Sequence, residues 1–157
     1  TETEWEYASR GALENSPYPW GGPYTRNIKG CFLANFKPLR GNYVADGGLK
    51  AIKTASYNPN GYGLYDMAGN VAEWTSNAYD EASFSYSHDM NSDLHYNANE
   101  DDHEVLKRKT IRGGSWKDIA YFIQTSTRTF EYQDTAKSYI GFRCAVDFLG
   151  RDKKDFE

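Results

Sequence analysis

The sequence predicts an α+β fold with little regular secondary structure, in which loops make up most of the chain. Of its 157 residues 39% are hydrophobic and 16% aromatic, enough for one domain whose core depends heavily on Tyr, Phe and Trp rings. The 14 glycines and a mean hydropathy of −0.81 argue against a helical bundle. We therefore expect one short helix, a few strands and many ordered turns.

The first element is expected to be a short amphipathic helix in TETEWEYASRG, the stretch from Thr1 to Gly11. Thr1 and Glu4 match a capping box, Trp5 and Ala8 can share one face, and Gly11 is a plausible terminator. The following stretch, NSPYPWGGPYTRN, is rich in Pro and Gly, which forbid regular structure. It predicts an ordered loop with aromatic rings beneath its turns.

The middle of the chain gives weaker signals. Residues 27–56 are broken by glycines and are expected to form loops with short strands. The apolar spacing in YNPNGYGLYDMAGNVAEWTS predicts a short helical turn around Val71 to Trp74. Residues 78–103 are the most polar region, and we expect them to run over the surface.

The strands are expected in TIRGGSW and IGFRCAV, the second because Phe142, Cys144 and Val146 alternate along one face. Arg112 and Arg143, one in each stretch, are more typical of ion-pair partners than of catalytic groups. Residues 1–149 are interpreted as one domain and residues 150–157 as a polar tail.

Charge and hydropathy exclude some functions. A net charge of −4 argues against a nucleic-acid partner, and the basic clusters LKRK and GRDKKDFE each adjoin carboxylates. No apolar run approaches the ~20 residues that span a bilayer, although the chain begins at Thr1, so an upstream leader or lipid anchor could have been lost. The three histidines, at positions 88, 95 and 103, are too irregularly spaced for a helical metal face.

Two cysteines, Cys31 and Cys144, form neither a disulfide framework nor a C-x-x-C metal motif. Counting alone leaves three possibilities: each is free, the two pair with each other, or each pairs with a cysteine outside this chain.

Six blocks in order carry a resemblance to a known family: TETEWEYASRG, YPWGG, LANF, NPNGYGLYDMAGNVAEWTS, IRGGSW and GFRCAVD. Together they resemble the formylglycine-generating-enzyme family, also called the sulfatase-modifying-factor domain, over nearly the whole chain. The resemblance implies a fold with little regular secondary structure related to C-type lectin-like domains, with the family's first portion missing. It also implies that Cys144 is half of a disulfide with an upstream cysteine, or a small buried residue if that partner is lost; Ser9 stands where the other disulfide has a cysteine.

Enzymes of this family use two copper-binding cysteines, just after the GGS block, to oxidise a substrate cysteine to formylglycine with molecular oxygen. The corresponding positions here are Asp118 and either Ile123 or a residue near Ala120, and nothing from Gly113 to Gly141 is a cysteine. Since Cu(I) requires soft sulfur ligands, we expect no copper and no formylglycine chemistry. The chain is interpreted as a pseudoenzyme.

The resemblance also implies two structural calcium sites. The first would use Asp66 and Glu73 with the carbonyls of Gly69 and Val71. The second would use Asn35 and Asp46 with the carbonyls of Phe36 and Gly48. Such oxygen donors suit Ca²⁺. The alternative is that Asp66 only caps the turn after it and that Glu73 is a solvent-facing helix residue.

A narrower resemblance is to the sulfatase-modifying-factor-like lipoproteins of the Bacteroidetes gliding-motility and type IX secretion machinery, the GldK/PorK kind. It rests on YPWGGPYTRNIKGCFLANFKPLRGNYVADGG, KRKTIRGGSWKDIAYF and TRTFEYQDTAKSYIGFRCAVDFLG. It implies a non-catalytic, self-associating scaffold subunit of a ring with protein partners, at the periplasmic side of the outer membrane, reached through a possible upstream lipid anchor.

Two other functions compete with the scaffold. A calcium-dependent glycan-binding module would use exposed Tyr and Trp rings. An enzyme of unrelated chemistry would be built from Asp118, Arg128, Glu131 or Asp134, yet no nucleophile–base pair is visible in the sequence. For the scaffold, we expect residues 78–103, together with the Trp116 to Phe122 segment, to be the contact surface.

Overall fold

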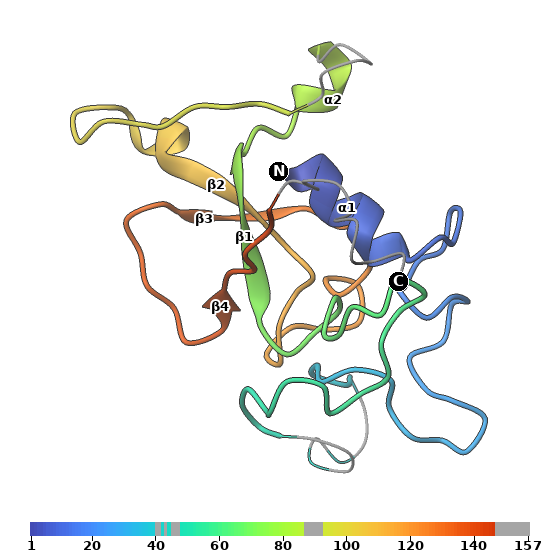
Figure 1. Ribbon diagram of the computed structural model, residues 1–157. Helices are drawn as coiled ribbons and strands as arrows, with labels where there is room; N and C mark the ends of the chain where they lie inside the picture. The colour runs from blue at the N-terminus through green and yellow to red at the C-terminus, as the bar shows by residue number, and fades with distance from the viewer. Residues whose placement is uncertain (40–41, 43, 45–47, 87–92, 147–157) are drawn as a thin grey trace, which may run out of the picture.

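Figure 1 shows the computed structural model, which describes residues 1–39, 42, 44, 48–86 and 93–146, the side chains of Phe84 and Tyr86 excepted. The elements in chain order are α1 (Glu2–Arg10), β1 (Ala72–Ala78), α2 (Ser83–Tyr86), the 3₁₀ helix η1 (Glu104–Lys107), β2 (Arg108–Arg112), β3 (Thr129–Tyr132) and β4 (Ile140–Gly141). Loops make up most of the rest, which confirms the predicted α+β chain with little regular structure. None of the helices in the described ranges is long and apolar enough to cross a bilayer.

Helix α1 forms as the sequence predicts. The side-chain oxygen of Thr1 accepts a hydrogen bond from the Glu4 amide, the Glu4 side chain completes the capping box, and Gly11 ends the helix with left-handed backbone at φ 55°. Its buried positions are Glu2, Trp5 and Ser9, so this helix turns a carboxylate as well as an indole ring towards the interior. Helix α1 contacts β1 and β2.

The four strands form one mixed sheet in the order β3-β2-β1-β4, with β1 parallel to β4 and the other pairs antiparallel. The helical turn expected around Val71 to Trp74 is wrong, because strand β1 begins at Ala72. Glu73 pairs with Arg112 of β2 on one side and with Gly141 of β4 on the other. These ladders, formed with residues far along the chain, decide the local structure.

Other expectations about strands need correction. The stretch IGFRCAV contributes only the two residues of β4, and the predicted apolar face beyond it is open to solvent, with Phe142 77% and Val146 87% exposed. Within the described part of residues 27–56 no strand forms, although Phe32 makes an isolated bridge with Arg26 just before this range. Strand β3 was not predicted.

The hydrophobic core lies among the loops. Its buried cluster consists of Tyr18, Ala34, Phe36, Ala68 and Ile123, with Trp20, Phe32 and Ala120 packed against it. The cluster joins the loop after α1, the segment before β1 and the segment after β2, and it confirms the expected dependence on aromatic rings. The proposed domain limit at residue 149 and the polar tail lie outside the described residues.

Candidate functional site

The segment from Gly113 to Arg128 follows β2 and folds into consecutive turns. Its start requires glycine, because Gly114 has φ 62° and a side chain there would come within 2.6 Å of the Phe122 carbonyl oxygen. The turn therefore closes tightly on itself, with Ser115 fully buried inside it. This segment contains both positions at which the family resemblance implies copper-binding cysteines.

Asp118, at the first of these positions, holds the turn together. Its Oδ2 accepts hydrogen bonds from the amide of Ser115 at 3.0 Å and from the Ser115 hydroxyl at 2.6 Å. Its own carbonyl accepts from the Lys37 amide at 2.8 Å, which ties the segment to a distant loop. The carboxylate is therefore used as a turn cap.

Ile123, at the second position, is completely buried in the hydrophobic cluster beside Tyr18 and Phe36. Ala120, the other residue considered for this position, packs against the same cluster, and its carbonyl accepts a hydrogen bond from the Tyr18 hydroxyl at 3.1 Å. Both thiols of the chain, Cys31 and Cys144, are free and exposed, so they do not pair with each other. The interpretation of Cys144 as a small buried residue is wrong; a partner outside this chain stays a prediction.

A hollow of about 390 Å³ lies next to this segment. It is lined by Phe36, Lys37, Gly48, Leu49, Trp116 and Lys117. The Lys117 ammonium lies 3.6 Å from the Asp118 carboxylate and 3.9 Å from the centre of the Tyr139 ring. Aromatic rings with a rim of lysine offer a binding surface but supply no nucleophile with a general base.

The residues considered for an unrelated enzyme have structural partners. Arg128 donates to Glu2 through both Nε, at 2.6 Å, and Nη2, at 2.9 Å. Glu131 lies in β3, where its Oε2 accepts from the Tyr139 hydroxyl at 3.4 Å. Asp134 is exposed. None of these three side chains forms a nucleophile–base pair with Asp118.

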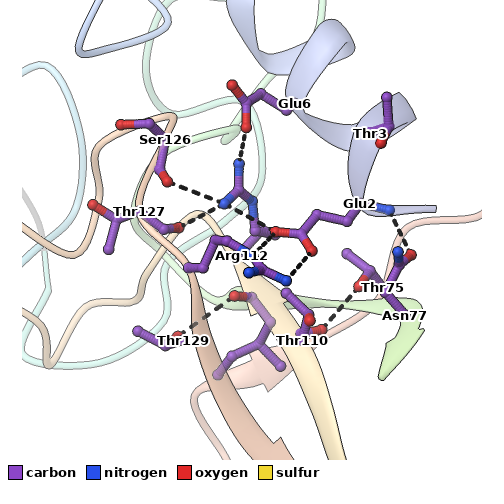
Figure 2. A network of polar contacts seen from close by, with 12 residues as sticks. Glu2, Thr3, Glu6, Thr75, Asn77, Thr110, Arg112, Ser126, Thr127 and Thr129 are labelled. Carbon is purple, nitrogen blue, oxygen red and sulfur yellow. Dashed lines mark hydrogen bonds and ion pairs between the residues drawn. The ribbon is translucent and has the colours of Figure 1, made fainter. Parts of the chain in front are cut away.

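The sequence predicts that Arg112 is an ion-pair partner, but it does not predict the network of buried charge to which Arg112 belongs. The Arg112 side chain is fully buried, and Figure 2 shows it between Glu6 of α1 and the backbone of the segment after β2. It donates to the carbonyls of Thr125, Ser126 and Thr127 at 2.8, 3.2 and 3.1 Å. It also forms an ion pair with Glu2 at 3.2 Å. Burial lowers the pKa of Arg112, against the opposing effect of Glu2 and Glu6.

Glu73, the strand member of the first proposed calcium site, is buried at 6% exposure, so its interpretation as a solvent-facing helix residue is wrong. Its carboxylate accepts from the Trp5 indole at 2.7 Å and twice from the Arg143 guanidinium, at 2.7 and 3.1 Å. Arg143 also donates to the Tyr65 carbonyl at 2.9 Å. Since two carboxylate oxygens offer about four acceptor positions, these bonds leave capacity for a further ligand.

Asp66, the loop member of that site, has left-handed backbone at φ 56°, and its Oδ2 accepts from the Ala55 amide at 3.0 Å. It caps a segment that precedes it, and not the turn that follows. Gly69 also has positive φ, at 75°, and a side chain there would come within 2.4 Å of the Asn35 carbonyl oxygen. Within the described ranges no group of three or more His, Cys, Asp or Glu side chains could hold a metal, so a cation here would need backbone carbonyls such as those of Gly69 and Val71.

The second proposed calcium site is described only in part, because Asp46 lies outside the described residues. The Asn35 amide nitrogen donates to the Lys50 carbonyl at 2.9 Å and to the Asn70 side-chain oxygen at 3.3 Å. Phe36 is buried in the core, and Gly48 is partly exposed. The Asn35 carbonyl accepts from the Asn70 amide at 2.7 Å, so the segments of the two proposed sites lie side by side.

The two segments that were expected to form one surface for partner proteins lie apart in the structure. The described residues 78–86 and 93–103 lie beyond the beginning of β2, whereas the Trp116 to Phe122 segment follows its end, so the two stretches are at opposite ends of this strand in Figure 1. They do not form one continuous surface. Tyr96 is 40% exposed and Tyr121 59% exposed, and the Tyr86 side chain lies outside the description.

Comparison with known proteins gives one family. The model of the sulfatase-modifying factor enzyme 1-like domain matches residues 1–148. The inactive C-alpha-formylglycine-generating enzyme 2 of Mus musculus is 34% identical over 99% of this chain and 44% of its own length. The formylglycine-generating enzyme of Mus musculus is 34% identical over 95% of this chain and 39% of its own length. The chain thus spans less than half the length of these relatives.

Solved structures agree with this result. The structure of PvdO from Pseudomonas aeruginosa superposes with a TM-score of 0.66 at 26% identity, covering 90% of this chain and 49% of that one. The Treponema denticola variable protein 1 superposes with a TM-score of 0.60 at 26% identity, covering 90% and 44%. Sheet, helix and loops are therefore arranged here as in these larger chains.

Proposed function

Because the chain belongs to the sulfatase-modifying factor enzyme 1-like domain family, we propose that it is a non-catalytic member whose function is to bind other proteins. One observation carries this proposal: Asp118 and Ile123 stand where thiols are needed, the first capping a turn and the second filling the core. A carboxylate is a hard ligand and a butyl group is no ligand, so neither can hold Cu(I). The relatives include proteins named as inactive as well as enzymes.

The assembly we propose is the ring of the type IX secretion and gliding-motility machinery, at the periplasmic side of the outer membrane. Its support is the narrower sequence resemblance. In this role the domain acts as a self-associating scaffold subunit that contacts companion proteins, and a lipid anchor would belong to an upstream part of a longer protein.

The proposed contact surface is residues 78–103. Tyr side chains suit protein contacts because they bury a large ring at low conformational cost and keep a polar tip. Tyr96 is exposed, and its hydroxyl donates to Asp102 at 2.9 Å, so the ring is presented in a fixed position. The Trp116 to Phe122 segment, at the other end of β2, is left out of this surface.

The experiment is native mass spectrometry of the complete protein purified with its neighbours. Substituting Tyr86→Asp and Tyr96→Asp should release the domain from the assembly and leave the circular dichroism spectrum unchanged. Tyr121→Asp is the matched control, because Tyr121 is also an exposed tyrosine but lies at the other end of β2. Persistence of the assembly in the double variant, or its loss in the control alone, would exclude residues 78–103 as the contact surface.

We also propose that calcium binds as a structural ion. Asp66 and Glu73 with the carbonyls of Gly69 and Val71 would hold one ion; Asn35 and Asp46 with the carbonyls of Phe36 and Gly48 would hold the other. All of these donors are oxygen, which suits a hard cation. Positive φ at Asp66, Gly69 and Asn70 supports the first site, since such backbone lets a loop turn its carbonyls inward. The bound ion would supply cross-links between loops that lack sheet bonding.

A further inference from the structure

Strand β1 contains a bulge that no part of the proposed function uses. Between Trp74, opposite Ile111, and Ala78, opposite Lys109, β1 advances four residues while β2 advances two. The extra residues redirect the side chains of Thr75, Ser76 and Asn77. Bulges of this kind are frequent beside functional sites because they aim side chains out of the regular alternation.

A hollow of about 500 Å³ opens over this bulge. It is lined by Trp74, Thr75, Ser76, His95, Tyr96, Asn97, Lys109 and Gln133. These residues come from β1, from β2, from the residue after β3 and from the loop that follows α2. The hollow shares no lining residue with the Gly113 to Arg128 segment or the proposed calcium sites, but His95, Tyr96 and Asn97 also belong to the proposed contact surface.

The walls of the hollow are fixed by hydrogen bonds. The Lys109 ammonium donates to the Tyr96 carbonyl at 2.6 Å, to the Asn97 side-chain oxygen at 2.7 Å and to the Ser76 carbonyl at 3.5 Å. The Gln133 amide nitrogen donates to the Ala98 carbonyl at 2.8 Å. A site held in this way needs little ordering when a ligand enters.

Several polar groups of the lining have no hydrogen-bond partner among the described residues. In the described ranges no hydrogen bond engages the Trp74 indole N–H, the Ser76 hydroxyl, the His95 ring or the side-chain oxygen of Gln133. The one cation of the lining, Lys109, already gives its three protons to protein oxygens. The remaining groups are hydrogen-bond donors and acceptors, and they line the hollow together with the rings of Trp74 and Tyr96.

We propose that this hollow binds a neutral saccharide. A sugar ring presents C–H groups on its faces and hydroxyls at its edge, which matches aromatic rings surrounded by indole, hydroxyl, imidazole and amide groups. An anionic ligand would find the Lys109 ammonium already engaged by protein oxygens. Binding requires no calcium, because no carboxylate lines the hollow.

The site extends beyond one ring. A second hollow of about 470 Å³ shares His95 and Tyr96 with the first. Its other lining residues include the apolar or aromatic Tyr79, Leu94 and Leu106 and the charged Asp80, Glu81 and Arg108, so of these two hollows only the first lacks carboxylates. Tyr96 lies between the two, and a chain of sugar units can contact it while occupying both. The ligand is thus an oligosaccharide.

The test uses the ¹⁵N-labelled protein titrated with cellotriose, maltotriose and triacetylchitotriose, each up to about 10 mM, which detects millimolar Kd values. Trp74→Phe identifies the Trp74 indole signal. We expect at least one probe, with EGTA present, to shift that signal and the Gln133 amide signals while the Trp5 indole, which is bonded to Glu73, stays in place.

Ser76→Ala and Gln133→Ala should each raise Kd about 3- to 10-fold, the effect of one hydrogen bond. Trp116→Phe, in the other hollow, is the control and should leave Kd unchanged. The proposal is overturned if no probe shifts the Trp74 signal or if the two alanine variants bind as the wild type does. Because His95, Tyr96 and Asn97 also belong to the proposed contact surface, the titration is done on the unassembled protein, and its outcome there does not depend on whether a ring forms.

Discussion

The carboxylate of Glu73 in β1 is held by the guanidinium of Arg143, which lies just beyond β4, at 2.7 and 3.1 Å. The ion pair joins the parallel strands at the point where their ladder ends, since Glu73↔Gly141 is the last pair. Trp5 of α1 donates to the same carboxylate, so one side chain links the helix and two strands. Glu73 is thus important for stability whether or not a cation binds beside it.

The calcium proposal is therefore tested at Asp66. Asp66→Asn removes a charge while keeping an oxygen to accept from the Ala55 amide. We expect EGTA to lower the Tm of the wild type by several degrees, on the order of 1–2 kcal/mol, and to lower the Tm of the variant by less, because the variant would keep only the second proposed site. Glu73→Ala should lower Tm even in EGTA. If EGTA leaves the wild-type Tm unchanged, Asp66 serves only as a hydrogen-bond acceptor.

Arg112 should be the most costly charge to remove. Arg112→Met leaves the buried Glu2 carboxylate and the Glu6 carboxylate with fewer partners and leaves three carbonyls unsatisfied, so we expect a loss of about 3–5 kcal/mol in urea unfolding. Arg10→Met is the matched control, because its pair with Glu6 is partly exposed and should be worth less than about 1 kcal/mol. Equal losses of unfolding free energy in the two variants would contradict the prediction that the buried network stabilises the fold more than the partly exposed pair does.

Alanine substitutions at Gly69 and Gly63 distinguish the free-energy cost of backbone strain from the cost of steric overlap. Both have positive φ, 75° and 78°, but a side chain at Gly63 meets nothing within 4 Å whereas one at Gly69 meets the Asn35 carbonyl. Gly63→Ala should cost about 1–2 kcal/mol from strain alone. Gly69→Ala should cost a further 1–3 kcal/mol from overlap, measured by urea unfolding. A similar cost at both positions would mean that the two loops do not pack as described.

Asp93 should contribute to stability above acidic pH. Burial acts to raise its pKa, but hydrogen bonds from Asn77 at 2.8 Å and from the Thr3 hydroxyl at 3.0 Å outweigh burial and lower the pKa below 3.8. A lowered folded-state pKa gives stability that is present above the unfolded pKa of about 3.9 and is lost as the pH falls through the folded value. Asp93→Asn should therefore flatten the dependence of Tm on pH below about pH 4. An unchanged acid slope would contradict this assignment.

The sequence predicted those elements that depend on neighbouring residues. Helix α1 is specified locally, by the capping box of Thr1 and Glu4 and by Gly11, and it was predicted correctly. Strand β1 depends on Arg112 and Gly141, partners far along the chain, and the spacing of Val71 and Trp74 imitates a helix. In such a fold the length of a strand depends on which residues pair across the sheet, and a single sequence does not show these pairs.

In the candidate site, too, some features can be read from the sequence and others depend on contacts between distant residues. That no cysteine lies between Gly113 and Gly141 could be read directly from the sequence. The use of Asp118 as a turn cap and the burial of Ile123 depend on contacts with Ser115 and Tyr18, and required the structure. Strand β3 could have been found, because Phe130 and Tyr132 alternate with polar residues over Thr129–Tyr132.

The most direct test of the central claim is mass spectrometry of a sulfatase-type cysteine peptide incubated with the complete protein, Cu(I) and molecular oxygen. The formylglycine-generating enzyme of Mus musculus serves as the positive control in the same buffer. We predict that the peptide keeps its cysteine with this protein and is converted to the aldehyde by the control. An aldehyde product formed by this protein, absent without copper, would contradict the conclusion that it is a non-catalytic member of its family.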